Sequence, residues 1–170
     1  HNRVYVVEVM GKNSGFIAVA AGLTGGAEAI LIPENPVNLD DVCKVILTNA
    51  KLGKAHSIVI VAEGYYEDPV SAEQSSGFRV GKYLAEKTGC DTRITILGHL
   101  QRGGTPTFFD RKLATLMGNK AVELLLDNET EKMIGIVNNR IQVFPLEKAL
   151  NTKKTISKQE LELAGIMSSI

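Results

Sequence analysis

The stretch Ser57-Ile58-Val59-Ile60-Val61-Ala62, followed at once by Glu63-Gly64, is the clearest indication of the fold class. A short run of apolar, mostly β-branched residues is typical of a strand buried in a parallel sheet. Similar runs recur along the chain and alternate with longer amphipathic segments. We expect strands at 4–10, 29–32, 57–62 and 93–97, each followed by a helix. The helices are expected at 14–21, from Asn38 or Asp40 to about Leu52, at 73–87 and at 108–126. Strand-then-helix units in series predict an α/β protein with a mainly parallel sheet and flanking helices.

Polar and glycine residues indicate where some of these elements begin and end. Ser14 is a candidate N-cap for the first helix, which is expected to close near Gly22. Towards the carboxyl end the alternation changes. There Asn138-Asn139 is a candidate hairpin turn between short strands at 133–137 and 141–144.

The composition disfavours two classes of protein. Lys and Arg number 19, Asp and Glu also 19, the formal net charge is 0, and aromatic residues make up 5%. This balance gives no support for binding a nucleic-acid backbone, so we expect no nucleic-acid partner. The longest apolar run, at 58–62, is far shorter than the roughly 20 residues of a membrane span, so we expect no membrane partner.

The cysteines and the first residues bear on location and completeness. Cys43 and Cys90 have no metal-binding or redox spacing, and we expect reduced thiols in a cytoplasmic protein. The chain opens with His1-Asn2-Arg3, without an initiator Met or a signal-peptide pattern, directly before a strand. We therefore expect a fragment of a longer protein.

Three glycine-bearing segments follow three of the expected strands. They are Gly11-Lys12-Asn13-Ser14-Gly15, Glu63-Gly64-Tyr65-Tyr66 and Gly98-His99-Leu100-Gln101-Arg102-Gly103-Gly104. Ligands of open α/β sheets bind outside the carboxyl ends of the strands, where these segments would meet. Glycine lets backbone N–H groups approach an anion, and Lys, His and Arg supply positive charge. One carboxylate among such groups suits a sugar phosphate.

Each segment taken alone also has a structural interpretation. Gly11 and Gly15 can be turn residues, and Lys12 a solvated surface residue. Glu63 can be a residue at the end of a strand, and His99 a structural side chain with a hydrogen-bond partner in the protein. Arg102 is harder to explain structurally, because the glycines beside it cost chain entropy without packing against anything. The three segments together favour a binding site.

Two arginines lie at the opposite ends of their strands. Arg3 and Arg93 stand six or seven residues before the glycine-bearing segments, a separation of roughly 20 Å at about 3.3 Å per residue. Either both are solvated residues at the start of a strand, or they complete the pocket of a neighbouring subunit in a symmetric oligomer.

The three segments resemble signature segments of a known family. Val6-Val7-Glu8-Val9-Met10-Gly11-Lys12, Ala62-Glu63-Gly64 and Leu97-Gly98-His99-Leu100-Gln101-Arg102-Gly103-Gly104 are similar to those of the 6-phosphofructokinases. Order and spacing match from Arg3 to at least Leu126. The resemblance implies a partial phosphofructokinase fold, corresponding to the carboxyl-terminal half of a bacterial-type subunit.

The resemblance also implies roles for individual residues. The fructose 6-phosphate site of the family falls on Arg3, Met10, Gly11, Lys12, Glu63, Arg93, His99 and Arg102. Arg3 and Arg93 would belong to the adjacent subunit's phosphate pocket, which implies a homo-oligomer, a tetramer in this family. Lys12 occupies the position of an arginine that helps neutralise the transferring phosphoryl group, so it is the candidate catalytic residue. Lysine keeps the charge but lacks the planar two-donor fork.

A second site is implied for a nucleotide effector at a subunit interface. Gly26 and Glu28 match its effector positions, Glu28 also its metal position, and Lys54 matches a phosphate-binding lysine. Leu52 stands where another lysine is usual, which weakens the expectation of allosteric control. Ordinary surface charge remains the other interpretation of Glu28 and Lys54.

The family's segments for the phosphoryl donor are not among these residues. Its glycine-rich nucleotide loop, its Gly-Gly-Asp-Gly-Ser-type segment and its Thr-Ile-Asp-type segment with the aspartate base do not occur in the 170 residues. ATP and its Mg²⁺ would therefore bind mainly outside this chain, and we expect no turnover by the chain alone.

The expected organisation has three parts. Residues 1–102 would form the fructose 6-phosphate-binding domain, and a possible domain change lies at Gly103-Gly104. Residues 103–150 would pack on the nucleotide-binding half, which leaves Phe108 and Phe109 exposed or buried by self-association. Residues 151–170 would form a returning helix, after a short helical segment at 146–151.

These expectations combine into one function with two alternatives. The chain is expected to be part of a glycolytic enzyme that transfers the γ-phosphoryl group of ATP to the 1-hydroxyl of fructose 6-phosphate. A pyrophosphate-dependent phosphofructokinase is one alternative, because the donor is selected outside this chain. A sugar-phosphate-binding module without catalysis is the other.

Overall fold

The computed structural model describes residues 3–66 and 75–167. The chain divides into two compact units, His1–Gly103 with Ile156–Ile170, and Gly104–Thr155. We refer to them as unit 1 and unit 2.

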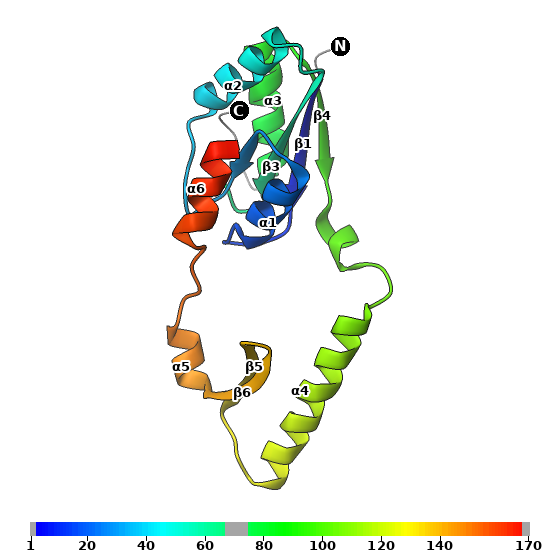
Figure 1. Cartoon of the computed structure of the whole chain (residues 1–170), viewed down its shortest axis with the longest axis vertical. Coiled ribbons are helices and arrows are strands. Elements are labelled where there is room, and N and C mark those ends of the chain that lie inside the picture. The colour runs from blue at the N-terminus through cyan, green and yellow to red at the C-terminus, as the bar shows by residue number, and fades with distance from the viewer. Residues whose placement is uncertain (1–2, 67–74, 168–170) are drawn as a thin grey trace. The chain divides into compact units, whose positions relative to one another are not determined.

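Unit 1 is built on a parallel sheet of four strands. These are β1 (Arg3–Val9), β2 (Ala29–Leu31), β3 (His56–Ala62) and β4 (Asp91–Ile96), in the order β2-β3-β1-β4 (Figure 1). Strand β3 contains the apolar stretch that indicated the fold class, and β1 lies beside it in the interior of the sheet. The expected α/β class with a mainly parallel sheet is confirmed.

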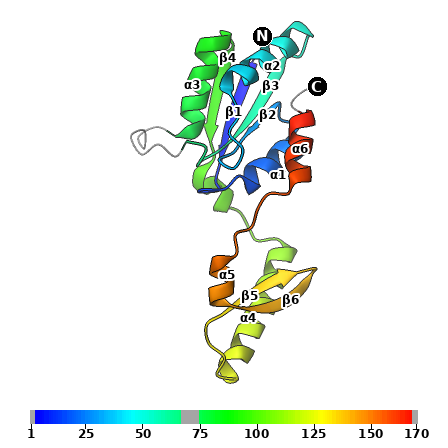
Figure 2. The same ribbon diagram turned by 90° about the vertical axis from the view of Figure 1, so that its left-hand side faces the viewer.

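Helices cover both faces of this sheet. Helices α2 (Leu39–Lys51) and α3 (Ser76–Thr88) pack on one face, and α1 (Phe16–Gly25) and α6 (Lys158–Met167) on the other (Figure 2). Helix α6 reaches this unit from the far end of the sequence and contacts α1 and β2.

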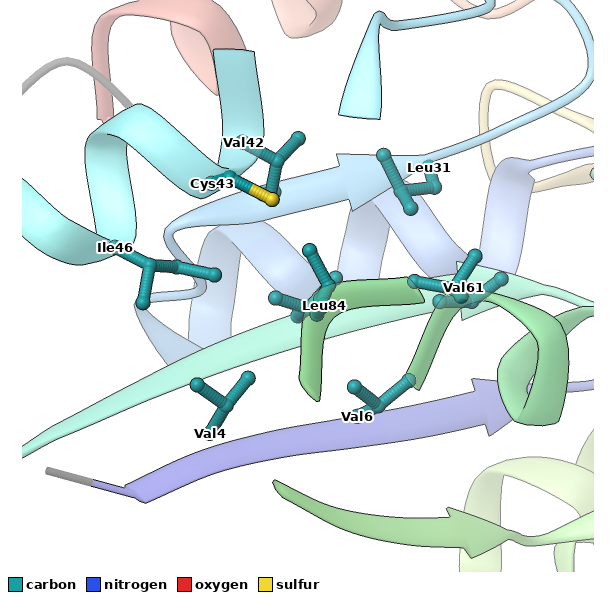
Figure 3. Packing of buried hydrophobic residues seen from close by; sticks show 11 residues of the cluster. Val4, Val6, Leu31, Val42, Cys43, Ile46, Val61 and Leu84 are labelled. Carbon is teal, nitrogen blue, oxygen red and sulfur yellow. The ribbon is translucent and has the colours of Figure 1, made fainter. Parts of the chain in front are cut away.

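The core under α2 and α3 follows the period-2 alternation of the strands. Val4 and Val6 of β1 and Val61 of β3 lie on the face of the sheet that is covered by α2 and α3. They share one core cluster with Ile46 of α2 and Leu84 of α3 (Figure 3). All five are at most 2% exposed. Burying a side chain of this size contributes about 1.5–3 kcal/mol, so this layer stabilises the register of the strands.

The first helix differs from the expectation at both ends. It begins at Phe16 after Gly15, and the Ser14 hydroxyl donates to the Gly11 carbonyl at 2.9 Å instead of capping the helix. It continues past Gly22, which is buried against Ile30, and ends where Gly26 adopts a left-handed conformation. The proposed Ser14 cap and the closure near Gly22 were therefore wrong.

Three other elements also start or end differently. Strand β4 begins at Asp91 and ends at Ile96. Helix α3 begins at Ser76 after the N-cap Ser75, and the expected start at residue 73 lies outside the described residues. The segment Gly98–Arg102, expected as a loop, forms a short 3-10 helix, η2.

Unit 2 combines one long helix with a hairpin. Helix α4 (Phe108–Leu126) opens with a capping box between Thr107 and Asp110. Strands β5 (Lys132–Val137) and β6 (Arg140–Pro145) pair antiparallel, and α5 (Leu146–Asn151) follows. Asn138 and Asn139 have φ values of 51° and 60°, which suits a two-residue hairpin turn. Phe108 and Phe109 of α4 are exposed within this unit.

Two further expectations concern the oxidation state of the cysteines and the presence of membrane-spanning helices. Cys43 and Cys90 are free thiols. Over residues 3–66 and 75–167, the helices are all too short or too polar to cross a bilayer.

Candidate functional site

The loops after β1, β3 and β4 meet at the carboxyl edge of the parallel sheet. The backbone pairing continues past the strand ends, because the N–H of Glu63 donates to the carbonyl of Val9 at 3.0 Å. On the other side of β1, the N–H of Leu97 donates to the carbonyl of Glu8 at 3.1 Å. The register of the sheet therefore places the three glycine-bearing segments side by side, as the sequence predicted.

Glu63 is hydrogen-bonded to the loop after β1. Its Oε1 accepts the N–H of Gly11 at 3.2 Å and also the N–H of Lys12. Gly64 lies against the same loop, since a Cβ at this residue would stand 2.0 Å from the carbonyl oxygen of Lys12. Only glycine allows the two loops to approach this closely.

Lys12 has a left-handed backbone, with φ of 51°. It lies in a tight turn in which the Gly11 carbonyl accepts both the N–H of Ser14, at 3.0 Å, and its hydroxyl. A long side chain in this conformation is uncommon and often marks a functional constraint. The turn presents the lysine at the rim of the sheet, where the residue is exposed.

Helix η2 carries His99 and Arg102 and is joined to the same loop. The Oε1 of Gln101 accepts the N–H of Met10 at 2.7 Å. Within the part of the chain that the structure describes, the side chains of Lys12, His99 and Arg102 make no hydrogen bond or ion pair. Their donors are thus available to a ligand at this edge.

A buried layer supports the edge from below. Glu8 is 7% exposed, and its Oε2 accepts the N–H of Gly77 in the first turn of α3 at 2.6 Å. The hydroxyl of Ser76, in the same turn, donates to the carbonyl of Glu63 at 2.8 Å. A carboxylate at a helix N-terminus is stabilised by the unpaired N–H groups there, so α3 fixes the position of both β1 and the Glu63 loop.

One part of the sequence-based interpretation needs correction. Glycine at position 11 was expected to let backbone N–H groups approach an anion. The N–H groups of Met10, Gly11 and Lys12 are instead occupied by the side-chain oxygens of Gln101 and Glu63. These three N–H groups are therefore not free to bind a phosphate.

Arg3 and Arg93 lie at the opposite end of the sheet and share one carboxylate. The Nε of Arg3 is 2.9 Å from Oδ2 of Asp91, and the Nε of Arg93 is 3.3 Å from Oδ1. Desolvation acts to raise the pKa of Asp91, but the hydrogen bonds and charges of the two arginines outweigh it and hold this pKa below its ordinary value. Hydrogen bonds to Tyr5 and Asp91 raise the pKa of Arg3.

Glu28 and Lys54 form an ion pair away from the carboxyl edge. Nζ of Lys54 is 2.5 Å from Oε1 of Glu28, whose Oε2 accepts the N–H of Ile58. Glu28 is 4% exposed, whereas Leu52, after the end of α2, is 76% exposed. Gly26 ends α1 in the turn before Glu28.

The donor atoms around Glu28 do not fit a magnesium site. Both carboxylate oxygens already have protein partners, so a cation there would have to displace Lys54. The described residues contain no group of three or more His, Cys, Asp or Glu side chains that could hold a metal ion.

Sequence reasoning missed several supporting residues. Gln101 lies in a glycine-rich segment but was given no role. Its amide oxygen, which can accept a backbone N–H, was the feature that could have indicated one. Glu8 looked like an ordinary strand residue. Asp91 was not considered, although a carboxylate two residues before Arg93 indicates a possible ion pair.

Comparison with known proteins agrees with the fold and with the order of the loops. The sequence profile of the family described as Phosphofructokinase matches residues 1–125. The chain is 50% identical over 171 residues to the ATP-dependent 6-phosphofructokinase of Halothermothrix orenii, an alignment covering 99% of this chain and 52% of that protein. The ATP-dependent 6-phosphofructokinase of Thermotoga neapolitana is 48% identical, with 99% and 50% covered. The chain thus spans about half the length of the curated relatives it matches.

A solved structure is similar over nearly the whole chain. The crystal structure of Pichia pastoris phosphofructokinase in the T-state aligns with a TM-score of 0.74 and 37% identity, covering 99% of this chain and 19% of that one. The profile match covers more than half of the chain and includes all three loops of the carboxyl edge. On these grounds, this chain belongs to the phosphofructokinase family.

Proposed function

We propose that this chain supplies the fructose 6-phosphate site of an ATP-dependent 6-phosphofructokinase, a cytoplasmic enzyme of glycolysis. The observation that carries the proposal is the meeting of Lys12, Glu63 and the His99–Arg102 turn at one edge of the sheet. The names of the most similar relatives also support it.

Each residue has a role consistent with its chemistry. His99 and Arg102 donate to the 6-phosphate, and a guanidinium binds phosphate with two donors at once. Met10 and Gly11 contact the sugar. The second carboxylate oxygen of Glu63, beyond the one bonded to Gly11 and Lys12, accepts a sugar hydroxyl.

Lys12 acts at the reacting end of the sugar. The 1-hydroxyl oxygen bonds to the γ-phosphorus of ATP while the bond from that phosphorus to the β–γ bridging oxygen breaks, and the hydroxyl proton passes to a base outside this chain. The ammonium of Lys12 stabilises negative charge on the transferring group. Mg²⁺ bound with ATP would neutralise further phosphate charge.

We further propose that Arg3 and Arg93 bind the 6-phosphate in the site of a neighbouring subunit. Both are held by Asp91 at the amino end of the sheet, about 20 Å from the carboxyl edge of their own unit. A homo-oligomer, a tetramer by the family resemblance, would bring one subunit's arginines to the next subunit's site.

We infer only a weak effector site at Gly26, Glu28 and Lys54. Lys54 already pairs with Glu28, and the neighbouring Leu52 brings no charge. A nucleotide diphosphate would have to break this ion pair to recruit Lys54.

The test is phosphoryl transfer by the full-length protein that contains this chain. With fructose 6-phosphate and either ATP or pyrophosphate as donor, we expect turnover with ATP, and none from the 170-residue chain alone. Turnover with pyrophosphate only would replace the proposed donor. Absence of transfer from both donors by a folded full-length protein would leave a binding module and contradict the proposal.

A further inference from the structure

Three consecutive backbone N–H groups in the loop after β1 are bound by two side-chain oxygens from other loops. Oε1 of Gln101 accepts from Met10 at 2.7 Å, and Oε1 of Glu63 accepts from Gly11 and Lys12. We call this arrangement the three-amide clamp. Its partners are 91, 52 and 51 residues apart in sequence, so it joins elements that only the folded sheet brings together.

The clamp holds a conformation that Lys12 would not adopt readily by itself. A non-glycine residue at φ of 51° persists where surrounding contacts determine it. Here the N–H of Lys12 is fixed by Glu63, the turn is closed by Ser14 on the Gly11 carbonyl, and Gly64 packs against the Lys12 carbonyl. The direction of the lysine side chain depends on these contacts.

Gln101 connects the loop of Lys12 to the segment that carries His99 and Arg102. It lies in η2 between His99 and Arg102, and η2 is itself anchored to β1 by the bond from Leu97 N–H to the Glu8 carbonyl. The bond from Met10 to Gln101 therefore links the segment carrying His99 and Arg102 to the segment carrying Lys12.

We propose that Gln101 is a positioning residue, which sets the distance between the group that stabilises the transferring phosphoryl and the groups that bind the 6-phosphate. This inference rests on the proposed function of the edge. The amide oxygen of Gln101 is occupied by the Met10 N–H. It acts on turnover through the placement of Lys12.

The test uses Gln101→Met and Gln101→Glu in the full-length protein. Methionine has a similar length but no strong acceptor, whereas glutamate keeps an oxygen at the same reach. Since misplacing a catalytic group by about 1 Å can cost up to about 100-fold in rate, we expect Gln101→Met to lower kcat about tenfold or more. We expect Gln101→Glu, measured at saturating fructose 6-phosphate, to retain kcat within about threefold of the parent because the acceptor is kept, while its negative charge beside His99 and Arg102 raises KM.

A double-mutant cycle with Lys12→Met separates positioning from general damage. When the lysine is gone, its placement no longer matters, so Gln101→Met should lower kcat by less than about twofold in that background. An equal loss of kcat with and without Lys12 would overturn the proposal, and so would an unchanged kcat in Gln101→Met.

Amide hydrogen exchange at residues 10–12 gives a second readout that does not depend on activity. Gln101→Met should speed exchange at Met10, and Gln101→Glu should not. If the wild-type protein phosphorylates no fructose 6-phosphate, the proposed function fails, and exchange alone decides whether the clamp exists. Unchanged exchange at Met10 in Gln101→Met would show that it does not.

Discussion

The Oε1 atom of Glu63 accepts the backbone N–H of Lys12, so the carboxylate after β3 fixes the turn that presents the lysine after β1. The carboxylate thus has a structural partner within the protein as well as a proposed sugar partner. Stability and activity should therefore respond differently when Lys12 is replaced.

Lys12→Gly should stabilise the protein while impairing turnover. Glycine adopts φ of 51° without strain, so the free energy of unfolding is expected to rise by about 1 kcal/mol. Loss of the ammonium should lower kcat for fructose 6-phosphate phosphorylation at least tenfold, roughly the effect of losing one charged transition-state contact. Urea denaturation and steady-state kinetics measure the two effects.

Asn138→Gly is the matched control for that substitution. Asn138 has the same φ of 51° but lies in the hairpin turn of unit 2. The Asn138→Gly protein should have a slightly higher free energy of unfolding and an unchanged kcat. If the Lys12→Gly protein is less stable than wild type, the lysine side chain stabilises the fold by more than the strain of its left-handed backbone costs.

Gly64→Ala should damage both the fold and the site. The new Cβ would lie 2.0 Å from the Lys12 carbonyl, so one loop must move, at a cost of about 1–3 kcal/mol. The KM for fructose 6-phosphate should rise as Lys12 and Glu63 separate. Gly25→Ala, at the last residue of α1 in unit 1, is the control: its Cβ meets nothing within 4 Å, and the free energy of unfolding should rise slightly. A stable Gly64→Ala variant with unchanged KM would contradict the close packing of these loops.

The contribution of Asp91 to stability should depend on pH in a defined direction. Its pKa is depressed in the folded state, so the carboxylate stabilises the fold above its ordinary pKa of 3.8, and this contribution is lost as the pH falls through the lower, folded-state pKa. The difference in unfolding free energy between wild type and Asp91→Asn should therefore be full at neutral pH and shrink in acid. A difference that stays constant as the pH falls from neutral to well below the ordinary pKa of 3.8 would rule out this role.

Leu52→Lys should strengthen any response to a nucleoside diphosphate. Leu52 is 76% exposed at the carboxyl end of α2, where a lysine also interacts favourably with the helix dipole. The added cation can bind a phosphate without breaking the Glu28–Lys54 pair. The measurement is the shift in KM for fructose 6-phosphate on adding the diphosphate, with Leu150→Lys in α5 as a control at another exposed leucine. An equal response in wild type and Leu52→Lys would show that residue 52 takes no part in the proposed effector site.

Much of the fold could be predicted because it depends on local patterns. The β-branched runs of β1 and β3 and the parallel topology were enough to place Lys12, Glu63 and His99 at one edge. The start of α1 was missed because Ser14 takes part in the turn around Lys12, a competing hydrogen bond that the capping pattern cannot reveal.

The clamp could not be predicted for a different reason. The bond between Met10 and Gln101 joins residues 91 positions apart, and its geometry depends on the register of β1 with β4. The same holds for Asp91, which faces Arg3 across that register. The sequence indicates which residue types are present, but the register decides which side-chain oxygens reach which donors.

The most direct test of a sugar-phosphate site at the carboxyl edge is the KM for fructose 6-phosphate of Arg102→Ala in the full-length protein. Removing a guanidinium that binds a phosphate should raise KM about tenfold or more, while Arg140→Ala, an exposed arginine of the β5–β6 hairpin, should leave KM unchanged. A KM that does not change in Arg102→Ala would contradict the site proposed here.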